Sequence, residues 1–142
     1  MTWATDRLDA LIAGTAEPPP VVRTLRLGTL DAWGPGWVRK RWLSQPDVLQ
    51  LDGSMFGGYI AALADQMLGL AALTVVPEGM AFRTVGLNVQ FFRLSRNEDI
   101  AIEARVVAQS KQLISVEAEF KNDSGGLIAK ATAQQVVTTL VP

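Results

Sequence analysis

Asp65 is the residue best suited to chemistry, because its carboxylate lies inside a long apolar tract, residues 57–76. On a helix its neighbours three and four residues away carry no cation, since they are Ala61, Ala62, Leu68 and Gly69. An unpartnered carboxylate is costly to bury, so its presence favours a base or a nucleophile. The structural alternative is that Asp65 faces solvent or accepts hydrogen bonds from a strand.

Gly57 and Gly58 stand at the start of the same tract. The first amides of a helix have no intrahelical acceptor, and glycine lets a ligand carbonyl approach them closely. The pair therefore indicates an oxyanion hole, although a tight turn or close packing would also explain it. Gln50, seven residues before Gly57, would present an amide to a substrate or a water, or is an ordinary loop residue.

The spacing of these residues constrains how they can cooperate. Gly57 and Asp65 are eight residues apart, which is about 12 Å along a helix axis. They cannot both act on one carbonyl carbon from the same chain. If both are catalytic, Gly57 of one subunit must meet Asp65 of another across a two-fold interface.

The composition of the 142 residues excludes several classes of site. There is no Cys and no His, so thiolate nucleophiles, imidazole bases and Cys- or His-ligated metals are all excluded. The net charge is −1, with no basic block, which argues against nucleic acid. We therefore expect no metal and no nucleic-acid partner.

Residues 1–21 are predicted to be a short helix and a linker, and residues 22–142 the domain proper. Thr5 would cap the helix, Gly14 would end it, and the prolines at 18–20 would prevent another. The first 14 residues lack a basic segment, so we expect no secretory signal and a cytoplasmic location. Residues 57–76 approach bilayer-spanning length, but Asp65 and Gln66 near their middle favour a buried helix over a membrane span.

The remaining pattern predicts strands around that helix. Strands are expected at 25–33, 37–43, 84–91, 98–109, 112–121 and 127–139, with 45–54 irregular and Pro77 and Gly79 ending the helix. In 84–91, Val85, Leu87, Val89 and Phe91 would share one face. Short turns would make the last four strands a meander. The fold class is α+β: a curved antiparallel sheet of about six strands around an apolar helix, whose uncovered side a second subunit would bury.

This arrangement resembles the hotdog-fold acyl-CoA thioesterases, specifically the phenylacetate-pathway-like branch. The resemblance covers about residues 22–139 and rests on the spacing of Gln50, Gly57-Gly58 and Asp65, on the segment 84–91, and on the turns near 109–111 and 122–126. It implies two sites at a dimer interface. Asp65 matches the catalytic acid, Gly57 the oxyanion donor, Gln50 the polar amide, and Thr84 a Ser/Thr that holds the attacking water.

Two positions depart from the family pattern. Phe56 stands where many members have His, which removes a hydrogen-bond donor to the thioester, and Ser110 stands where Gly is common. Phe56, Tyr59 and Met67 would line an acyl pocket or belong to the core, and Gly58 would lie against the substrate. Arg93, Arg96, Ser110 and Lys111 would contact CoA, although scattered cations are more often simply solvated.

The predicted function is hydrolysis of an acyl-CoA, or less favourably an acyl carrier protein thioester, with no cofactor beyond the CoA of the substrate. The alternative is a non-catalytic acyl-CoA-binding protein, which Phe56 favours and Asp65 opposes. A hydratase of the same fold is disfavoured because it would need an Asp–His pair. We expect a homodimer, with tetramers also common in the family.

Overall fold

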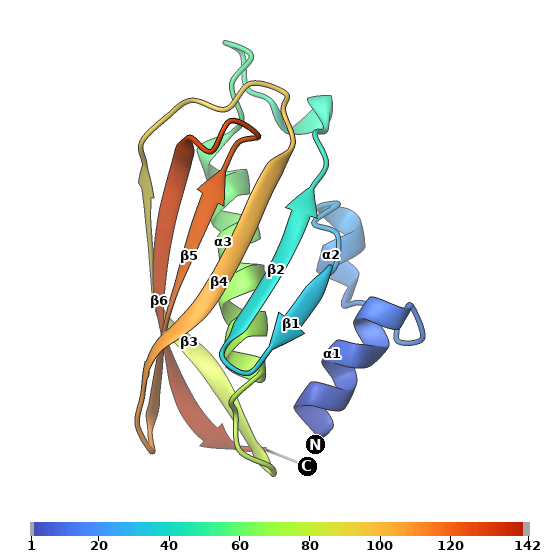
Figure 1. Cartoon of the computed structure of the whole chain (residues 1–142), viewed down its shortest axis with the longest axis vertical. Coiled ribbons are helices and arrows are strands. Elements are labelled where there is room, and N and C mark those ends of the chain that lie inside the picture. The colour runs from blue at the N-terminus through green and yellow to red at the C-terminus, as the bar shows by residue number, and fades with distance from the viewer. Residues whose placement is uncertain (1, 141–142) are drawn as a thin grey trace.

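The computed structural model describes residues 2–140. The helices are α1 (Trp3–Ala13), α2 (Pro20–Thr24) and α3 (Gly57–Leu73), with a 3-10 turn, η1, at Pro46–Val48. The strands are β1 (Ala32–Gly34), β2 (Trp37–Trp42), β3 (Met80–Phe91), β4 (Ile100–Gln109), β5 (Leu113–Lys121) and β6 (Leu127–Thr139). All six form one antiparallel sheet that curves around α3 (Figure 1). The predicted α+β architecture is confirmed.

The core lies between α3 and the concave face of the sheet. The buried face of α3 carries its large apolar side chains, including Leu63, Met67 and Leu68, which are fully buried. Alternate residues of β4 and β5 meet them as predicted, with Ile100, Ile102, Ala104, Ile114, Val116, Ala118 and Phe120 all buried. In β6 the inward positions below the helix are alanines at 129, 131 and 133, which let the helix approach the sheet closely.

The strand order corrects the predicted meander. The order is β1-β2-β4-β5-β6-β3, so of the last four strands only β4, β5 and β6 form a meander, and β3 pairs with β6 at the far edge. Residues 92–99 cross the end of the sheet between β3 and β4 (Figure 1). The prediction failed because alternation shows which face of a strand is buried and not which strand lies beside it.

A bulge in β3 corrects the predicted alternation there. Thr84 pairs with Gln135, but the next pairing is Gly86 with Gln134, so Val85 is the extra residue. Val85 and Leu87 are 66% and 41% exposed, and Leu87 lies opposite the buried Ala133. Because a bulge shifts the parity of a strand, Thr84 and Leu87 share the inner face.

The N-terminal segment also differs from the prediction. Thr2 caps α1, and Thr5 completes a capping box with it, while Gly14 ends the helix in the left-handed conformation as expected. Pro20 begins α2 instead of preventing it, because proline is tolerated at the first helical position. The strand predicted at 25–33 is mostly irregular, and β1 begins only at Ala32.

Side-chain donors hold the irregular segment by its carbonyls. Tyr59 Oη donates to the carbonyls of residues 25 and 26 at 2.7 and 3.0 Å, and Gln45 Nε2 also donates to residue 26. Lys40 Nζ donates to residue 27 at 2.5 Å, and Gln66 Nε2 donates to residue 28 at 2.7 Å. Four consecutive carbonyls are thus bound, and we call residues 25–28 the clamped segment.

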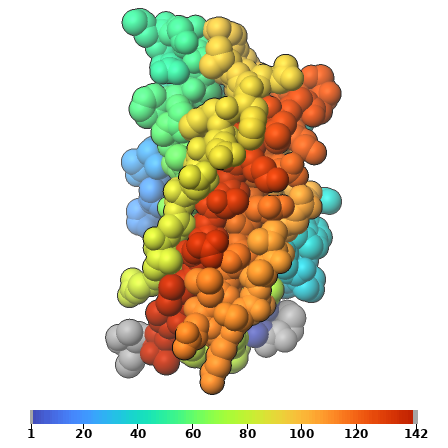
Figure 2. Space-filling model, turned by 90° about the vertical axis from the view of Figure 1, so that its left-hand side faces the viewer, coloured from blue at the N-terminus to red at the C-terminus, as the bar shows by residue number. Residues whose placement is uncertain are grey.

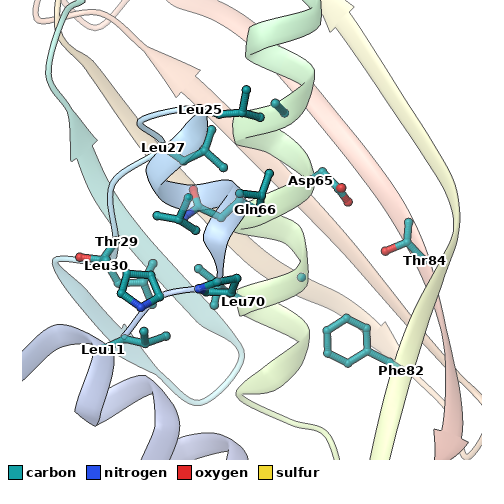
Figure 3. Close-up of a pocket in the computed structure, with 16 residues that line it drawn as sticks. Leu11, Leu25, Leu27, Thr29, Leu30, Asp65, Gln66, Leu70, Phe82 and Thr84 are labelled. Carbon is teal, nitrogen blue, oxygen red and sulfur yellow. The ribbon is translucent and has the colours of Figure 1, made fainter. Parts of the chain in front are cut away.

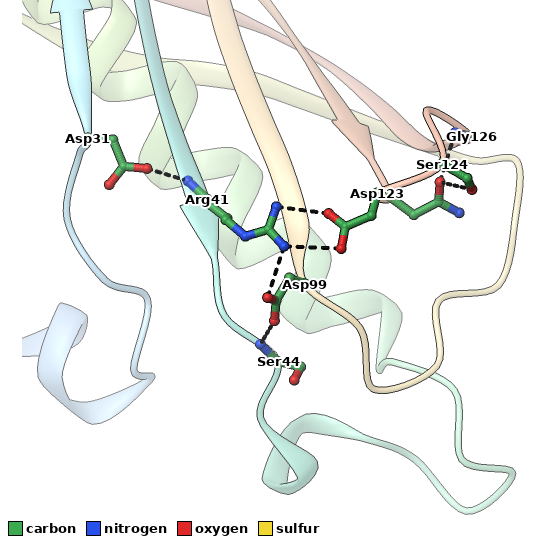
Figure 4. A network of polar contacts seen from close by, with 8 residues as sticks. Asp31, Arg41, Ser44, Asp99, Asp123, Ser124 and Gly126 are labelled. Atoms are coloured by element: carbon green, nitrogen blue, oxygen red, sulfur yellow. Dashed lines mark hydrogen bonds and ion pairs between the residues drawn. The ribbon is translucent and has the colours of Figure 1, made fainter.

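The outer end of the sheet is tied by an exposed ionic network (Figure 4). The guanidinium of Arg41 donates to Asp123 at 2.8 Å and to Asp99 at 3.1 Å, and Asp99 also accepts from the Ser44 amide. These contacts connect β2 with the start of β4 and with the turn between β5 and β6. Because the groups are exposed, they contribute less to stability than the apolar core does.

β3 is the exposed edge of the sheet along most of its length (Figure 2). To the left of β3 in that view lie the residues that precede α3, in green, and part of the N-terminal segment, in blue. No helix within residues 2–140 combines the length and apolarity needed to cross a membrane.

Candidate active site

Asp65 and Thr84 lie on opposite walls of one cavity. Asp65 projects from the exposed side of α3, Thr84 from the inner face of β3, and their side chains point toward one another (Figure 3). Within residues 2–140 no side chain or amide pairs with the Asp65 carboxylate. Thr84 Oγ1 donates to Gln135 Oε1 at 2.6 Å. A carboxylate and a hydroxyl oxygen in this arrangement can hold a water molecule between them.

The rest of this cavity is mostly apolar. Its volume is about 390 Å³. Phe82 and Leu70 also line it, and the N-terminal segment supplies much of the wall through Pro18, Pro19, Val21, Val22, Leu25, Leu27 and Leu30. The clamped segment therefore fixes part of the wall. Such a lining suits an apolar group with a polar end near Asp65.

Gly57 and Gln50 line a different cavity at the N-terminal end of α3. It is bordered by Phe91, Phe92 and Arg93. Phe56 caps the helix without a side-chain hydrogen bond, and neither the Gly57 nor the Gly58 amide donates a hydrogen bond within the described residues. These amides are available to a ligand oxygen.

Each of the two glycines lies close to an aromatic ring. A Cβ on Gly57 would lie 3.3 Å from the ring of Phe91, and one on Gly58 would lie 2.7 Å from the ring of Phe56. Gln50 Nε2 donates to Ser54 Oγ at 2.9 Å within its own loop. Close packing and open amides thus coincide at this end of the helix.

No lining residue is common to the two cavities. They are two separate cavities in one chain, one at the start of α3 and one at its middle. The sequence predicted an apolar helix with one side that the sheet does not cover. Within one chain, α3 does have such an uncovered stripe along its outer side. That stripe contains Gly58, Ala61, Ala62, Asp65 and Gly69, all exposed or only partly buried.

The predicted acyl-contacting residues lie in different surroundings. Phe56 is 56% exposed and lines a shallow pocket with Tyr59. Burial raises the pKa of Tyr59, whose hydroxyl is engaged by the clamped segment and by Trp42. Met67 is fully buried in the core. None of these three lines the cavity that contains Asp65.

The predicted CoA-contacting residues lie at two ends of the sheet. Arg93 borders the Gly57 cavity, and Arg96 follows nearby, donating to the Asp52 carbonyl at 2.8 Å. Ser110 and Lys111 form the turn between β4 and β5, where Ser110 Oγ accepts from the Leu113 amide. The structure brings Arg93 and Gly57 together and leaves Ser110 and Lys111 apart from both.

Sequence reasoning missed three contributors to these sites. Gln135 binds Thr84, Phe82 lines the Asp65 cavity, and Lys40 holds the cavity wall. Lys40 is only 4% exposed, and its burial lowers the pKa of its ammonium to about 7. A buried amide and a buried lysine at inward strand positions are signals in the alternation pattern that could have been noticed. No three Asp or Glu carboxylates within residues 2–140 gather so as to hold a metal ion.

Comparison with known proteins places the chain in a family. The family model described as Thioesterase superfamily matches residues 52–129, which is more than half of the chain. The chain belongs to this superfamily. A protein of Saccharolobus solfataricus that bears the name of an esterase is 38% identical over 79 residues, 56% of each chain. The chain therefore spans about half the length of this curated relative.

Solved structures of thioesterases share the fold. A phenylacetic acid degradation-related protein of Ralstonia eutropha is 24% identical with a TM-score of 0.81, covering 91% of this chain and 98% of its own. A Haemophilus influenzae thioesterase is 18% identical with a TM-score of 0.81, covering 100% and 95%. A Streptococcus pneumoniae thioesterase-type protein solved with coenzyme A is 21% identical with a TM-score of 0.72, covering 80% and 87%. At these identities the likeness establishes the hotdog fold.

Membership in the thioesterase superfamily and the hotdog fold confirm the resemblance seen in the sequence. The matched residues include Gly57, Asp65 and Thr84 but not Gln50. The roles of the individual site residues remain predictions.

Proposed function

We propose that the protein hydrolyses the thioester of an acyl-CoA to the free acid and CoA. The observation that carries this proposal is the Asp65 carboxylate facing the Thr84 hydroxyl across an apolar cavity. Membership in the thioesterase superfamily supports the reaction class. The neighbour solved with coenzyme A supports the CoA portion of the substrate.

The chemistry requires a nucleophile at the carbonyl carbon and donors for the developing oxyanion. In the water route, Asp65 accepts a proton as the water oxygen bonds to carbon, and the carbonyl electrons move to oxygen. Collapse of the intermediate then breaks the carbon–sulfur bond, and the sulfur takes the proton from Asp65. Direct attack by Asp65, giving an anhydride that water cleaves, yields the same products.

The oxyanion donor in this proposal comes from a second subunit. Within one chain the Gly57 amide lies in a separate cavity from Asp65, so each half-site is incomplete alone. The edge strand β3 exposes apolar side chains, among them Leu87 and Phe91, on the side of the sheet that faces α3. A homodimer formed over this side would bury them and align the start of one α3 with the middle of the other.

The apolar cavity beside Asp65 is the proposed acyl pocket. Its lining offers Asp65, Gln66 and two threonines as its polar side chains, so a charged acyl group would be desolvated without a partner. An aromatic or medium-length aliphatic acyl group matches this lining. Arg93, beside Gly57, is the proposed contact for the CoA phosphates.

One observation favours a second candidate, a non-catalytic acyl-CoA-binding protein. Phe56 supplies no side-chain hydrogen bond at the start of α3, and its ring lies against Gly58. An oxyanion site built from backbone amides and Gln50 alone would stabilise the transition state less than one with an additional donor.

Thiol release from a panel of acyl-CoAs distinguishes the two candidates. The panel contains acetyl, hexanoyl, decanoyl, phenylacetyl and succinyl thioesters, and binding is measured in parallel by calorimetry. Hydrolysis predicts thiol release that is fastest for an apolar acyl group and slowest for succinyl. Binding of acyl-CoA without thiol release above background would select the non-catalytic candidate.

A further inference from the structure

Gln135 is a buried amide on the inner face of the sheet. It is 0% exposed, and it pairs with Thr84 of β3 on one side and with Ile114 of β5 on the other. Neighbouring inward positions on β6 are alanines, at 131 and 133. An apolar residue would satisfy the alternation of this strand, whereas a buried amide destabilises the fold unless its polar atoms are bound.

Gln135 contacts Thr84, one of the two polar residues of the proposed site. Its Oε1 accepts the Thr84 hydroxyl hydrogen at 2.6 Å, while its Nε2 is buried without a hydrogen-bond partner among residues 2–140. The bulge at Val85 keeps Thr84 on the inner face opposite Gln135 while the rest of β3 continues in shifted register. The bulge and the buried amide with one unpaired polar atom are both destabilising, and both lie next to Thr84.

We propose that Gln135 is a positioning residue that fixes the Thr84 hydroxyl as a hydrogen-bond acceptor toward the Asp65 cavity. Thr84 has one hydroxyl hydrogen, and Gln135 Oε1 takes it, so the lone pairs of Oγ1 remain for a ligand in the cavity. This inference rests on the proposed hydrolysis and adds to it how the water is oriented.

The consequence is a water held through both of its hydrogens. One hydrogen points to the Asp65 carboxylate and the other to Thr84 Oγ1, so a lone pair of the water oxygen is left to attack the thioester carbon. Without Gln135 the Thr84 hydroxyl can rotate and donate to the water or to Asp65, which misdirects that lone pair. The effect should therefore appear in kcat and not in KM.

A double-mutant cycle tests this role. Gln135→Met is close in length and removes both polar atoms, and we expect kcat to fall about tenfold with KM unchanged. In a Thr84→Val background the same substitution should cost nothing further, because the hydroxyl it positions is gone. Gln135→Leu is measured in both backgrounds as well, so that a folding defect of the Met variant does not decide the result.

Gln134 provides a matched control on the same strand. Its exposed side chain accepts from Ser115 Oγ at 2.7 Å on the outer face, so Gln134→Met removes an equivalent bond away from the site. This control should keep the wild-type kcat. Equal losses in the Gln134 and Gln135 variants, or losses that add to that of Thr84→Val, would overturn the positioning role. Absence of thiol release by the wild-type protein would instead overturn the proposed function itself.

Discussion

The first turn and the middle of α3 present opposite chemistry from one helix. At the start of α3, Gly57 and Gly58 contribute backbone donors and no functional side chain. At its middle, Asp65 contributes an acceptor that faces another oxygen, that of Thr84. Donors for an oxyanion and an acceptor for a proton are both needed for acyl transfer, and this helix separates them by about 12 Å. In the proposed hydrolysis, one α3 would therefore complete the site with a second copy of itself.

Asp65→Asn tests the acceptor half and should have the largest effect. The substitution is nearly isosteric but removes the base and the nucleophile, so kcat should fall by at least about a hundredfold. Steady-state thiol release on the best substrate of the panel measures this. Thermal unfolding of the variant serves as the control for folding, and a wild-type kcat in a folded variant would refute the role of Asp65.

Phe56→His tests the start of α3, which supplies the proposed oxyanion donors. An imidazole at the N-cap of α3 adds a donor close to the proposed oxyanion position, and a hydrogen bond worth about 1 kcal/mol would raise kcat/KM by three- to tenfold. The measurement uses phenylacetyl- and hexanoyl-CoA. No gain on either substrate would mean that this end of the helix is organised around the Phe56 side chain.

Lys40→Met tests how Lys40 holds the wall of the Asp65 cavity, through the pH dependence of protein stability. Burial lowers the pKa of folded Lys40 to about 7 from an ordinary 10.5, so between these values the unfolded state binds a proton that the folded state does not. Stability should therefore rise from pH 7 to about 9.5 in the wild-type protein, and this contribution should disappear in the variant. Urea unfolding at several pH values measures it.

The pH range stops at about 9.5 so that Tyr59 does not contribute. Because the pKa of Tyr59 is raised in the folded state, its titration lowers stability only above the ordinary value of 10.0. An equal slope in wild-type and Lys40→Met proteins would show that Lys40 is not buried as a neutral amine.

Gly69→Ala and Gly57→Ala compare the two halves by stability, with the smallest expected effect. A Cβ on Gly69 would lie 3.8 Å from Phe82, an ordinary contact, so alanine should raise the unfolding free energy by about 0.5–1 kcal/mol. A Cβ on Gly57 would lie 3.3 Å from Phe91, so that variant should not gain. Denaturant unfolding measures both, and an equal gain at the two positions would contradict the tighter packing at Gly57.

The fold could be predicted from the sequence where local pattern determines it. The apolar tract predicted α3 from its first residue, and alternation predicted β4, β5 and β6. The pairing of β3 with β6 and the bulge at Val85 could not be predicted, because each depends on contacts distant in sequence. The helix α2 was missed for a local reason, since proline is tolerated at the first helical position. Asp65, Thr84, Gly57 and Gln50 were chosen from type and spacing. Gln135 could have been noticed as an amide at an inward strand position, but its contact with Thr84 could not, because only the folded sheet brings the two together.

A mixed-dimer experiment tests most directly whether the two halves of the site come from different subunits. Gln50→Ala damages the donor half and Asp65→Asn the acceptor half, and each variant alone should be nearly inactive. After the two are unfolded, mixed and refolded, about half of the dimers should be mixed, each with one site that carries both lesions and one that carries neither. Differently tagged chains verify the mixing, and each variant refolded alone is the control. Activity should recover to about a quarter of wild type, whereas recovery near zero from verified mixed dimers would place Gln50 and Asp65 in the site of a single chain.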